Sequence, residues 1–214
     1  MCVVVLAIWR GCQARGAGSA AGVVGGASIV VDSEKHQLDV PGTLMVCPST
    51  MIAAIHDWVA SLARHGFERV YFFNGHGGNV ATIEAAFSEI YADRSLAQDA
   101  SNRGPVKCKR VNWWDFKPVM EFCQKRYGSA HGAHATPSEV AVTWFVHPHA
   151  IKDVEMAPKV APWGRYTDAE SYRAAFPDGR IGSDPSLADP KDGERLIALS
   201  VEGLIEDFRK FEAA

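Results

Sequence analysis

The feature that most constrains this chain is a glycine-rich heptapeptide, residues 74–80, with the sequence NGHGGNV. It follows an apolar run, residues 70–73, which predicts a buried strand. It precedes residues 81–91, where apolar side chains recur at helical spacing. His76 is therefore expected in a turn at the carboxyl end of a strand, which is where open α/β sheets bind ligands. A histidine in such a crevice is suited to hold a metal ion or to move a proton.

Hydrophobic spacing along the rest of the chain predicts strands that alternate with helices. Predicted strands cover residues 28–31, 70–73 and 106–112, and predicted helices cover residues 48–65, 81–91, 115–126, 136–145 and 189–211. Residues 148–188 are rich in Pro, Gly and Asp and show weak periodicity. This order of elements favours an α/β fold with a mainly parallel sheet that is covered on both faces. In the last helix we expect a core stripe of Leu196, Leu199, Leu204, Ile205 and Phe208.

The composition disfavours several classes of protein. The chain has 214 residues, which suit one domain or one domain with a small appendage. Lys plus Arg number 22 and Asp plus Glu number 25, which gives a net charge of −3. This balance lacks the excess of positive charge that binding of nucleic acid or an anionic membrane requires. Five cysteines without CxxC or zinc-finger spacing are typical of reduced thiols in a cytoplasmic protein. No apolar run approaches the roughly 20 residues of a membrane helix. We therefore expect a cytoplasmic protein that binds neither nucleic acid nor membrane.

The N-terminus departs from the regular pattern. Residues 2–9 form a short apolar run that predicts a first strand, and residues 10–26 are rich in Gly, Ala and Arg with little periodicity. Positive charge follows the apolar run instead of preceding it, which disfavours a secretory signal peptide. A disordered stretch, a wrong start codon or a shifted reading frame would each produce such a segment. We interpret residues 1–27 as an atypical N-terminus and residues 28–214 as the main domain.

A second group of chemically active side chains, His131, His134 and Glu139, lies within nine residues. Neutral imidazole and carboxylate are usual protein ligands of zinc and similar ions, but this spacing matches no short metal motif. Glu139 also has a structural explanation. Residues 136–139, TPSE, form a capping-box sequence, in which the Glu accepts a hydrogen bond from the backbone N–H of Thr136. Capping and metal binding both remain open for Glu139.

Four segments together resemble the creatininase family, which contains creatinine amidohydrolases and related metal-dependent amide hydrolases. Residues 73–79, preceded by residues 62–67, are similar to the family signature, and the PGTL of residues 41–44 is similar to its FPGT turn. Residues 134–140 resemble its HAGExET segment, and residues 179–193 resemble its C-terminal GxxGDP stretch. The resemblance runs in the same order from about residue 38 to the end of the chain, so that the main domain is identified as creatininase-like.

The resemblance implies a three-layer α/β/α fold, a dinuclear site for a divalent metal such as zinc, manganese or iron, and homo-oligomers, often hexamers. His76 matches a metal ligand of the family, and Glu139 matches a glutamate that the family places at the metal centre. His134 matches the histidine that moves protons near the scissile amide. Substrate contacts are implied for Gly77, Gly78, Trp113 and Trp114. For the Trp pair, core packing after a strand is the competing explanation.

One segment that the resemblance leads us to expect is missing. Family members carry, after their first strand, a segment that supplies a Glu, a His and a bridging Asp to the metals, whereas residues 1–27 contain none of these residue types. The nearest Glu-x-His order is Glu34 and His36, which we expect on the next strand and outside the ligand segment. Two ligands rarely hold a catalytic ion, since three protein ligands are typical of catalytic zinc.

In the activity that the resemblance implies, metal-activated water attacks an amide carbonyl and His134 gives a proton to the leaving nitrogen. The implied substrate is a cyclic amide such as creatinine, a formamide or a short peptide. The first alternative is an amidohydrolase whose site is completed by Glu34 and His36 or by a neighbouring subunit. The second is an impaired family member that acts as an oligomer subunit or binding protein. A nucleotide-binding protein is disfavoured, because residues 75–78 lack the GxGxxG order and no P-loop Lys follows. From the incomplete ligand set we expect weak metal binding and poor hydrolysis.

Overall fold

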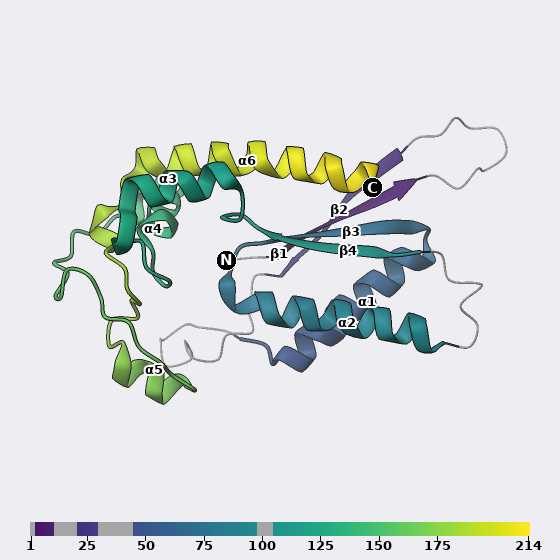
Figure 1. Ribbon diagram of the computed structural model, residues 1–214, viewed down its shortest axis with the longest axis horizontal. Helices are drawn as coiled ribbons and strands as arrows, with labels where there is room; N and C mark the ends of the chain where they lie inside the picture. The colour runs from purple at the N-terminus through teal and green to yellow at the C-terminus, as the bar shows by residue number, and fades with distance from the viewer. Residues whose placement is uncertain (1–2, 11–20, 30–44, 98–104) are drawn as a thin grey trace. The chain divides into compact units, whose positions relative to one another are not determined.

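The structure is a computed structural model that describes residues 3–10, 21–29, 45–97 and 105–214. Its strands and helices are β1 (Val3–Arg10), β2 (Ala21–Ile29), α1 (Pro48–Arg64), β3 (Phe67–Asn74), α2 (Val80–Leu96), β4 (Lys107–Asn112), α3 (Lys117–Tyr127), α4 (Pro137–Val146), α5 (Ala169–Ala175) and α6 (Pro190–Ala213) (Figure 1). These elements form two compact units. Unit 1 holds the strands, α1, α2 and the last turn of α6 from Phe208, and unit 2 holds residues 114–207.

The sheet of unit 1 has the strand order β2-β1-β3-β4. β3 and β4 are parallel, with Asn74 opposite Asn112, and β1 runs antiparallel to both β2 and β3. The α/β class predicted from the sequence is confirmed, with its parallel pairing between β3 and β4. The first apolar run forms a strand, as expected. β2 includes residues 21–26, where the sequence shows little periodicity, while residues 30 and 31 of the predicted strand lie outside the described residues.

One face of the sheet is covered by α1 and α2, which lie side by side (Figure 1). Val70 and Phe72 of β3 are both fully buried. They lie on the same face of the sheet, because side chains two residues apart on a strand point the same way. Phe72 meets Phe87 of α2 with ring centroids 5.1 Å apart. The apolar stripe of α1 that contacts this core consists of Met51, Ile55 and Val59. The helix predicted over residues 48–65 is therefore confirmed, with one face in the core.

The opposite face of β3 packs against the C-terminal turn of α6. Tyr71 is fully buried, and its ring centroid lies 5.5 Å from that of Phe208 and 5.7 Å from that of Phe211. Lys109 of β4 lies over the Phe211 ring, with Nζ 5.9 Å from the centroid. Helices therefore cover both faces of β3, which explains why the run from Val70 to Phe73 is apolar without alternation.

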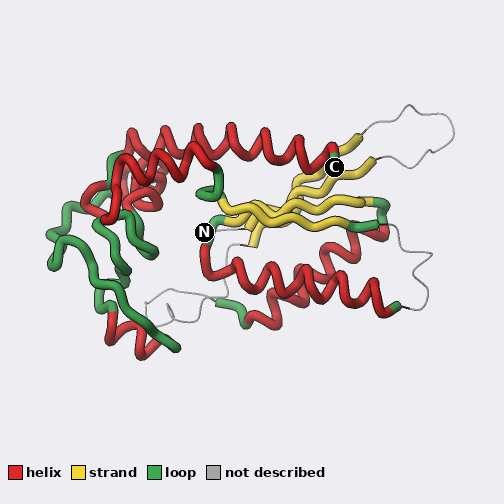
Figure 2. Tube along the Cα trace, viewed as in Figure 1, coloured by secondary structure: helices red, strands yellow, loops and turns green. Residues whose placement is uncertain are grey.

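Unit 2 consists of helices and loops (Figure 2). α3, α4 and α6 match three predicted helices, and Pro137 occupies the first turn of α4, as expected. α5 lies within the segment of weak periodicity and was not predicted; it begins with a capping box between Asp168 and Ser171. The expected place of Ile205 in the core stripe of α6 is wrong, because its side chain is 45% exposed. At about 100° per residue, position 205 lies on the face of the helix opposite to the buried Leu196.

The thiols of Cys47, Cys108 and Cys123 are free. Within the described ranges, the structure contains no helix whose length and apolar character would let it span a membrane.

Candidate functional site

In unit 1, a network of buried amides fixes the turn that carries His76. The side-chain Nδ2 of Asn74 donates to the Oδ1 of Asn112 at 2.7 Å and to the backbone carbonyl of His76 at 2.6 Å. Its Oδ1 accepts from the His76 backbone N–H at 3.3 Å and from the Asn79 side chain at 3.4 Å. Asn74, Asn79 and Asn112 are all buried. One amide at the end of β3 therefore holds both sides of the turn.

The turn places His76 in a buried position at the carboxyl ends of β3 and β4. The His76 backbone is extended, with φ −144° and ψ 133°, and it precedes a short 3₁₀ turn over Gly77–Asn79 that leads directly into α2. The His76 side chain is only 7% exposed. Gly77 is exposed, and a Cβ at this position would meet no atom within 4 Å. A ligand can therefore approach the backbone of Gly77 without meeting a side chain there.

In unit 2, the second predicted segment is joined to the C-terminal motif by a short antiparallel bridge. His134 pairs with Ile181, and the backbone N–H groups of Ala133 and His134 both donate to the Ile181 carbonyl, at 2.8 and 3.4 Å. Gly132 lies so close to the segment around Ile181 that a Cβ on Gly132 would be 2.5 Å from the Ile181 oxygen and the Ser183 nitrogen. The two segments that carry the family resemblance in this half of the chain are thus packed backbone to backbone.

His134 is held by groups from the same unit. Its Nδ1 lies 2.5 Å from the carbonyl oxygen of Gly179 and 3.1 Å from the hydroxyl of Tyr172. The Tyr172 hydroxyl also donates to the Gly179 carbonyl at 2.6 Å, and Ser183 Oγ donates to the His134 carbonyl at 2.6 Å. The imidazole of His134 is half-buried. A histidine in this setting has a fixed ring orientation and can move a proton at a defined nitrogen.

The side chain of Glu139 forms the capping box of α4. Its Oε2 accepts from the Thr136 backbone N–H at 3.0 Å and from Thr136 Oγ1 at 2.8 Å, while the Glu139 N–H donates to Thr136 Oγ1 at 3.3 Å. Of the two roles that the sequence leaves open for Glu139, the structure therefore shows the cap. Binding of a metal by Glu139 would require the carboxylate to leave these donors or to use its other oxygen.

His131 lies beside this capping box. Its Nε2 is 2.8 Å from Ser138 Oγ, which in turn is 3.0 Å from Thr136 Oγ1. The ring of His131 stacks on Tyr127, with centroids 5.8 Å apart. Burial lowers the pKa of His131, and the charge of the Glu139 carboxylate opposes that shift. Ser138 is only 2% exposed whereas His131 is half-buried, and the contact between them orders the start of α4.

The predicted metal ligands lie in different units: His76 in unit 1 and Glu139 in unit 2. Their convergence on one ion stays a prediction, and Glu34 and His36 lie outside the described residues. Among the residues that the structure does describe, no three His, Cys, Asp or Glu side chains are grouped as a metal site requires. The described donors therefore do not by themselves fit a catalytic metal ion.

The predicted substrate contacts are partly structural in this fold. Trp113 follows β4 directly, is half-buried, and its backbone N–H donates to the Asn74 carbonyl at 3.2 Å. This bond extends the β3–β4 pairing past Asn112 and ties the Trp pair to the His76 turn. Trp114 is also half-buried. A substrate role for Trp113, Trp114, Gly77 and Gly78 stays a prediction.

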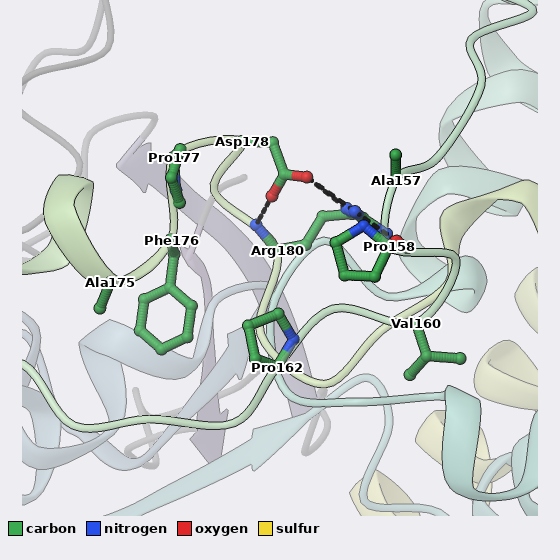
Figure 3. A pocket seen from close by; sticks show the side chains of 9 residues that line it. All are labelled: Ala157, Pro158, Val160, Pro162, Ala175, Phe176, Pro177, Asp178 and Arg180. Carbon is green, nitrogen blue, oxygen red and sulfur yellow. Dashed lines mark hydrogen bonds and ion pairs between the residues drawn. The ribbon is translucent and has the colours of Figure 1, made fainter.

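A cavity of about 450 Å³ lies in unit 2, and its described lining includes none of the site residues predicted from the sequence (Figure 3). Its wall is largely apolar, with Pro158, Pro162 and Phe176. The buried guanidinium of Arg180 in this wall donates to the Asp178 carboxylate at 2.7 and 2.8 Å and to the carbonyls of Pro158 at 2.9 Å and Lys159 at 3.0 Å. These donors already have acceptors, so Arg180 stabilises the wall of the cavity and does not offer an anion site.

The fold and the His76 turn define an α/β protein with a candidate ligand site at the carboxyl ends of its parallel strands. The chain belongs to the creatininase family: residues 11–208 match the family described as creatininase, creatinine amidohydrolase. The match begins earlier in the chain than the motifs near residue 38 from which the resemblance is drawn. No curated protein matches the chain.

Solved creatininases share the fold. A Glu-to-Gln mutant creatininase complexed with creatine is 21% identical, with a TM-score of 0.67 over 84% of this chain and 73% of that one. A mutant of the Zn–Zn type is 21% identical, with a TM-score of 0.66 over 84% and 71%. A manganese creatininase is 19% identical, with a TM-score of 0.66 over 84% and 72%. Divalent metals therefore occur in the family.

The ordering roles of three residues in these turns were not predicted from the sequence. Asn112 was expected only as the end of a strand, and parallel pairing with Asn74 was the signal that could have singled it out. Tyr172 and Gly179 lie 38 and 45 residues from His134 in a segment of weak periodicity, and no local pattern connects them to it.

Proposed function

We propose that this chain is an amidohydrolase of the creatininase family that cleaves a non-peptide C–N amide bond in a cyclic amide or a formamide. Membership of the family supports the reaction class. The observation that carries the proposal is the amide network that fixes His76 at the carboxyl ends of β3 and β4. A protein that needed this turn only as a connection would have no reason to bury three Asn side chains around one histidine, because each buried amide must find partners.

His134 and His76 have different roles in the proposal. His134 moves protons between water and the leaving nitrogen, and the Gly179 carbonyl and the Tyr172 hydroxyl orient its ring through Nδ1. His76 is proposed as a metal ligand, and Glu139 as a second one after it leaves its cap. Since the described donors number fewer than the three that are typical of catalytic zinc, we expect weak metal binding. The proposed small-molecule partner is tested first with creatinine and creatine, since a matching structure holds creatine. Assembly into a homo-oligomer is also proposed.

A second candidate is an impaired family member that binds a small molecule or acts as a subunit without turning over substrate. The engagement of the Glu139 carboxylate by Thr136 favours it, because Oε2 already accepts two hydrogen bonds in the cap and competes with binding of a metal. In this case the fixed His76 turn would serve ligand binding alone.

The test combines metal content with hydrolysis. The purified chain is measured by elemental analysis and then assayed on creatinine and on an N-formyl amine, with added zinc or manganese and with a chelator. Chelator-sensitive release of product, lost in His76→Ala, supports the amidohydrolase. Binding of creatine without turnover at any metal concentration favours the second candidate. Metal uptake that is the same in His76→Ala contradicts the proposed role of His76.

A further inference from the structure

We propose that Tyr172 is a positioning residue for His134: together with the Gly179 carbonyl, it holds the neutral ring as the Nδ1–H tautomer, so that Nε2 is the nitrogen that exchanges protons with substrate. The inference rests on the proposed amide hydrolysis for its functional meaning. Its structural part, the tautomer of one ring, can be measured without any activity.

The direction of each hydrogen bond fixes the tautomer. A carbonyl oxygen can only accept, and Nδ1 of His134 lies 2.5 Å from that of Gly179, so Nδ1 must carry a hydrogen. The Tyr172 hydroxyl donates its own hydrogen to the same carbonyl at 2.6 Å. At 3.1 Å from Nδ1, its oxygen can then act only as a second acceptor for the Nδ1 hydrogen. In the neutral ring the lone pair is therefore on Nε2.

Tyr172 is suited to this role because its ring is buried and packed between other aromatic rings. It is 1% exposed, and its ring centroid lies 5.4 Å from that of Phe176 and 5.1 Å from that of Tyr166. It belongs to α5, whose first turn is closed by the capping box of Asp168 and Ser171. The ring of His134 meets that of Tyr172 edge to face, with centroids 5.9 Å apart. Packing thus fixes the hydroxyl, and the hydroxyl limits where the imidazole can turn.

The Gly179 carbonyl is fixed as well. Gly179 has φ +81°, and its N–H donates to the Phe176 carbonyl at 2.9 Å, which closes a turn after α5. The next residue, Arg180, is anchored by the Asp178 carboxylate through its backbone N–H and its guanidinium. A Cβ on Gly179 would lie 3.6 Å from the Tyr172 hydroxyl, so the glycine is required by its backbone angle and not by lack of space.

A single histidine is enough for the proposed hydrolysis, because the same imidazole accepts and then returns the proton. Water adds through its oxygen to the amide carbonyl carbon and gives a proton to Nε2 of His134. The C–N bond then breaks, and the same Nε2 proton passes to the leaving nitrogen. The products are a carboxylic acid and an amine, and the ring returns to its Nδ1–H form. With the opposite tautomer, Nε2 already carries a hydrogen and cannot accept the proton from water.

The tautomer is measured by ¹⁵N NMR of histidine-labelled full-length protein, with the His134 signals assigned from the spectrum of His134→Gln. We expect the Nδ1–H tautomer at His134 in the wild type. In Tyr172→Phe, which keeps the packed ring and removes only the hydroxyl, we expect a mixture of tautomers, because the imidazole and the Gly179 carbonyl both lose a hydrogen-bond partner and the ring can turn away from that carbonyl. The matched control is Tyr91→Phe, which removes a hydroxyl that bonds the Cys108 backbone in unit 1 and should leave the His134 signals unchanged.

A kinetic readout links the tautomer to function. In Tyr172→Phe we expect kcat for amide hydrolysis to fall about tenfold, the lower end of the loss seen when hydrogen-bond partners of metal-ligating histidines are removed. KM should change little, because Tyr172 acts through His134. An Nε2–H tautomer in the wild type would overturn the proposal, as would an unchanged tautomer and kcat in Tyr172→Phe. If the wild type shows the Nδ1–H tautomer but hydrolyses no amide, the positioning by Tyr172 stands and the proposed function fails.

Discussion

The side-chain amide of Asn74 donates to the Oδ1 of Asn112 at 2.7 Å, and this bond ties together the carboxyl ends of β3 and β4. The parallel register places the two residues opposite each other at the last position of both strands. The same Asn74 amide also donates to the His76 carbonyl and accepts from the His76 backbone N–H. Hydrogen bonds therefore join the sheet to the candidate ligand turn, and we expect a substitution of Asn112 to alter the position of His76.

Replacement of Asn112 by Ala tests this coupling. One N–H of the buried Asn74 amide then loses its acceptor, so we expect the free energy of unfolding to fall by about 1–3 kcal/mol. The measurement is a urea titration of both proteins. Ser95→Ala, which removes an exposed hydroxyl bonded to the Tyr91 carbonyl, is the control and should change the free energy by less than about 0.5 kcal/mol. A loss of stability no larger than in this control would show that the amide network does not hold the turn.

Elements with a strong local signal could be predicted from the sequence. α1 begins at Pro48 and ends before Gly66, whose φ of +86° is easy only for glycine, and both boundaries were expected. The run from Val70 to Phe73 could be assigned to a strand because it is apolar throughout and ends in a turn. The cap at Thr136 could be anticipated from four residues, because a capping box is a local interaction.

The remaining features depend on contacts between distant segments. β2 contains three glycines and alternates little, and it is a strand because β1 supplies its hydrogen-bond partners. The antiparallel direction of β1 beside β3 likewise has no signal in either strand alone. For the candidate site, the motifs identified His76 and His134, whereas Tyr172 and Gly179 were found only from their bonds to His134.

The two roles of Glu139 can be separated by a pair of substitutions. Gln at position 139 can still accept from Thr136, so Glu139→Gln should keep the free energy of unfolding within about 0.5 kcal/mol of the wild type while it lowers zinc uptake. Thr136→Ala removes the cap itself and should cost about 0.5–2 kcal/mol. Stability is followed by thermal melts and zinc by elemental analysis. Equal zinc uptake in wild type and Glu139→Gln would remove Glu139 from the proposed ligands.

The ion pair of Asp178 and Arg180 predicts a dependence of stability on pH. Burial raises the pKa of Asp178, but the hydrogen bonds and charge of Arg180 outweigh it, so the pKa lies below its ordinary value of 3.8. A carboxyl with a lowered pKa stabilises the fold above its unfolded pKa, and this contribution is lost as the pH falls through the folded pKa. Asp178→Asn should therefore lower the melting temperature at pH 7 and have less effect at pH 3. The control is Asp57→Asn, whose side chain is 86% exposed. A difference that grows toward pH 3 would contradict the assigned direction.

The close approach of Gly132 to the strand of Ile181 predicts a strong effect of adding one methyl group. In Gly132→Ala the Cβ would lie 2.5 Å from the backbone of Gly182 and from the Ile181 oxygen, at a φ of +71° that side chains disfavour. Strain and overpacking together should cost about 2–4 kcal/mol. Because the same backbone contact positions His134 against Gly179, hydrolysis should also be lost in any folded fraction.

The matched control is Gly77→Ala, where the added Cβ meets nothing within 4 Å and the free energy of unfolding should change by less than about 0.5 kcal/mol. Urea titrations of both variants give the comparison, and equal midpoints would show that the segments around Gly132 and Ile181 are not packed as described.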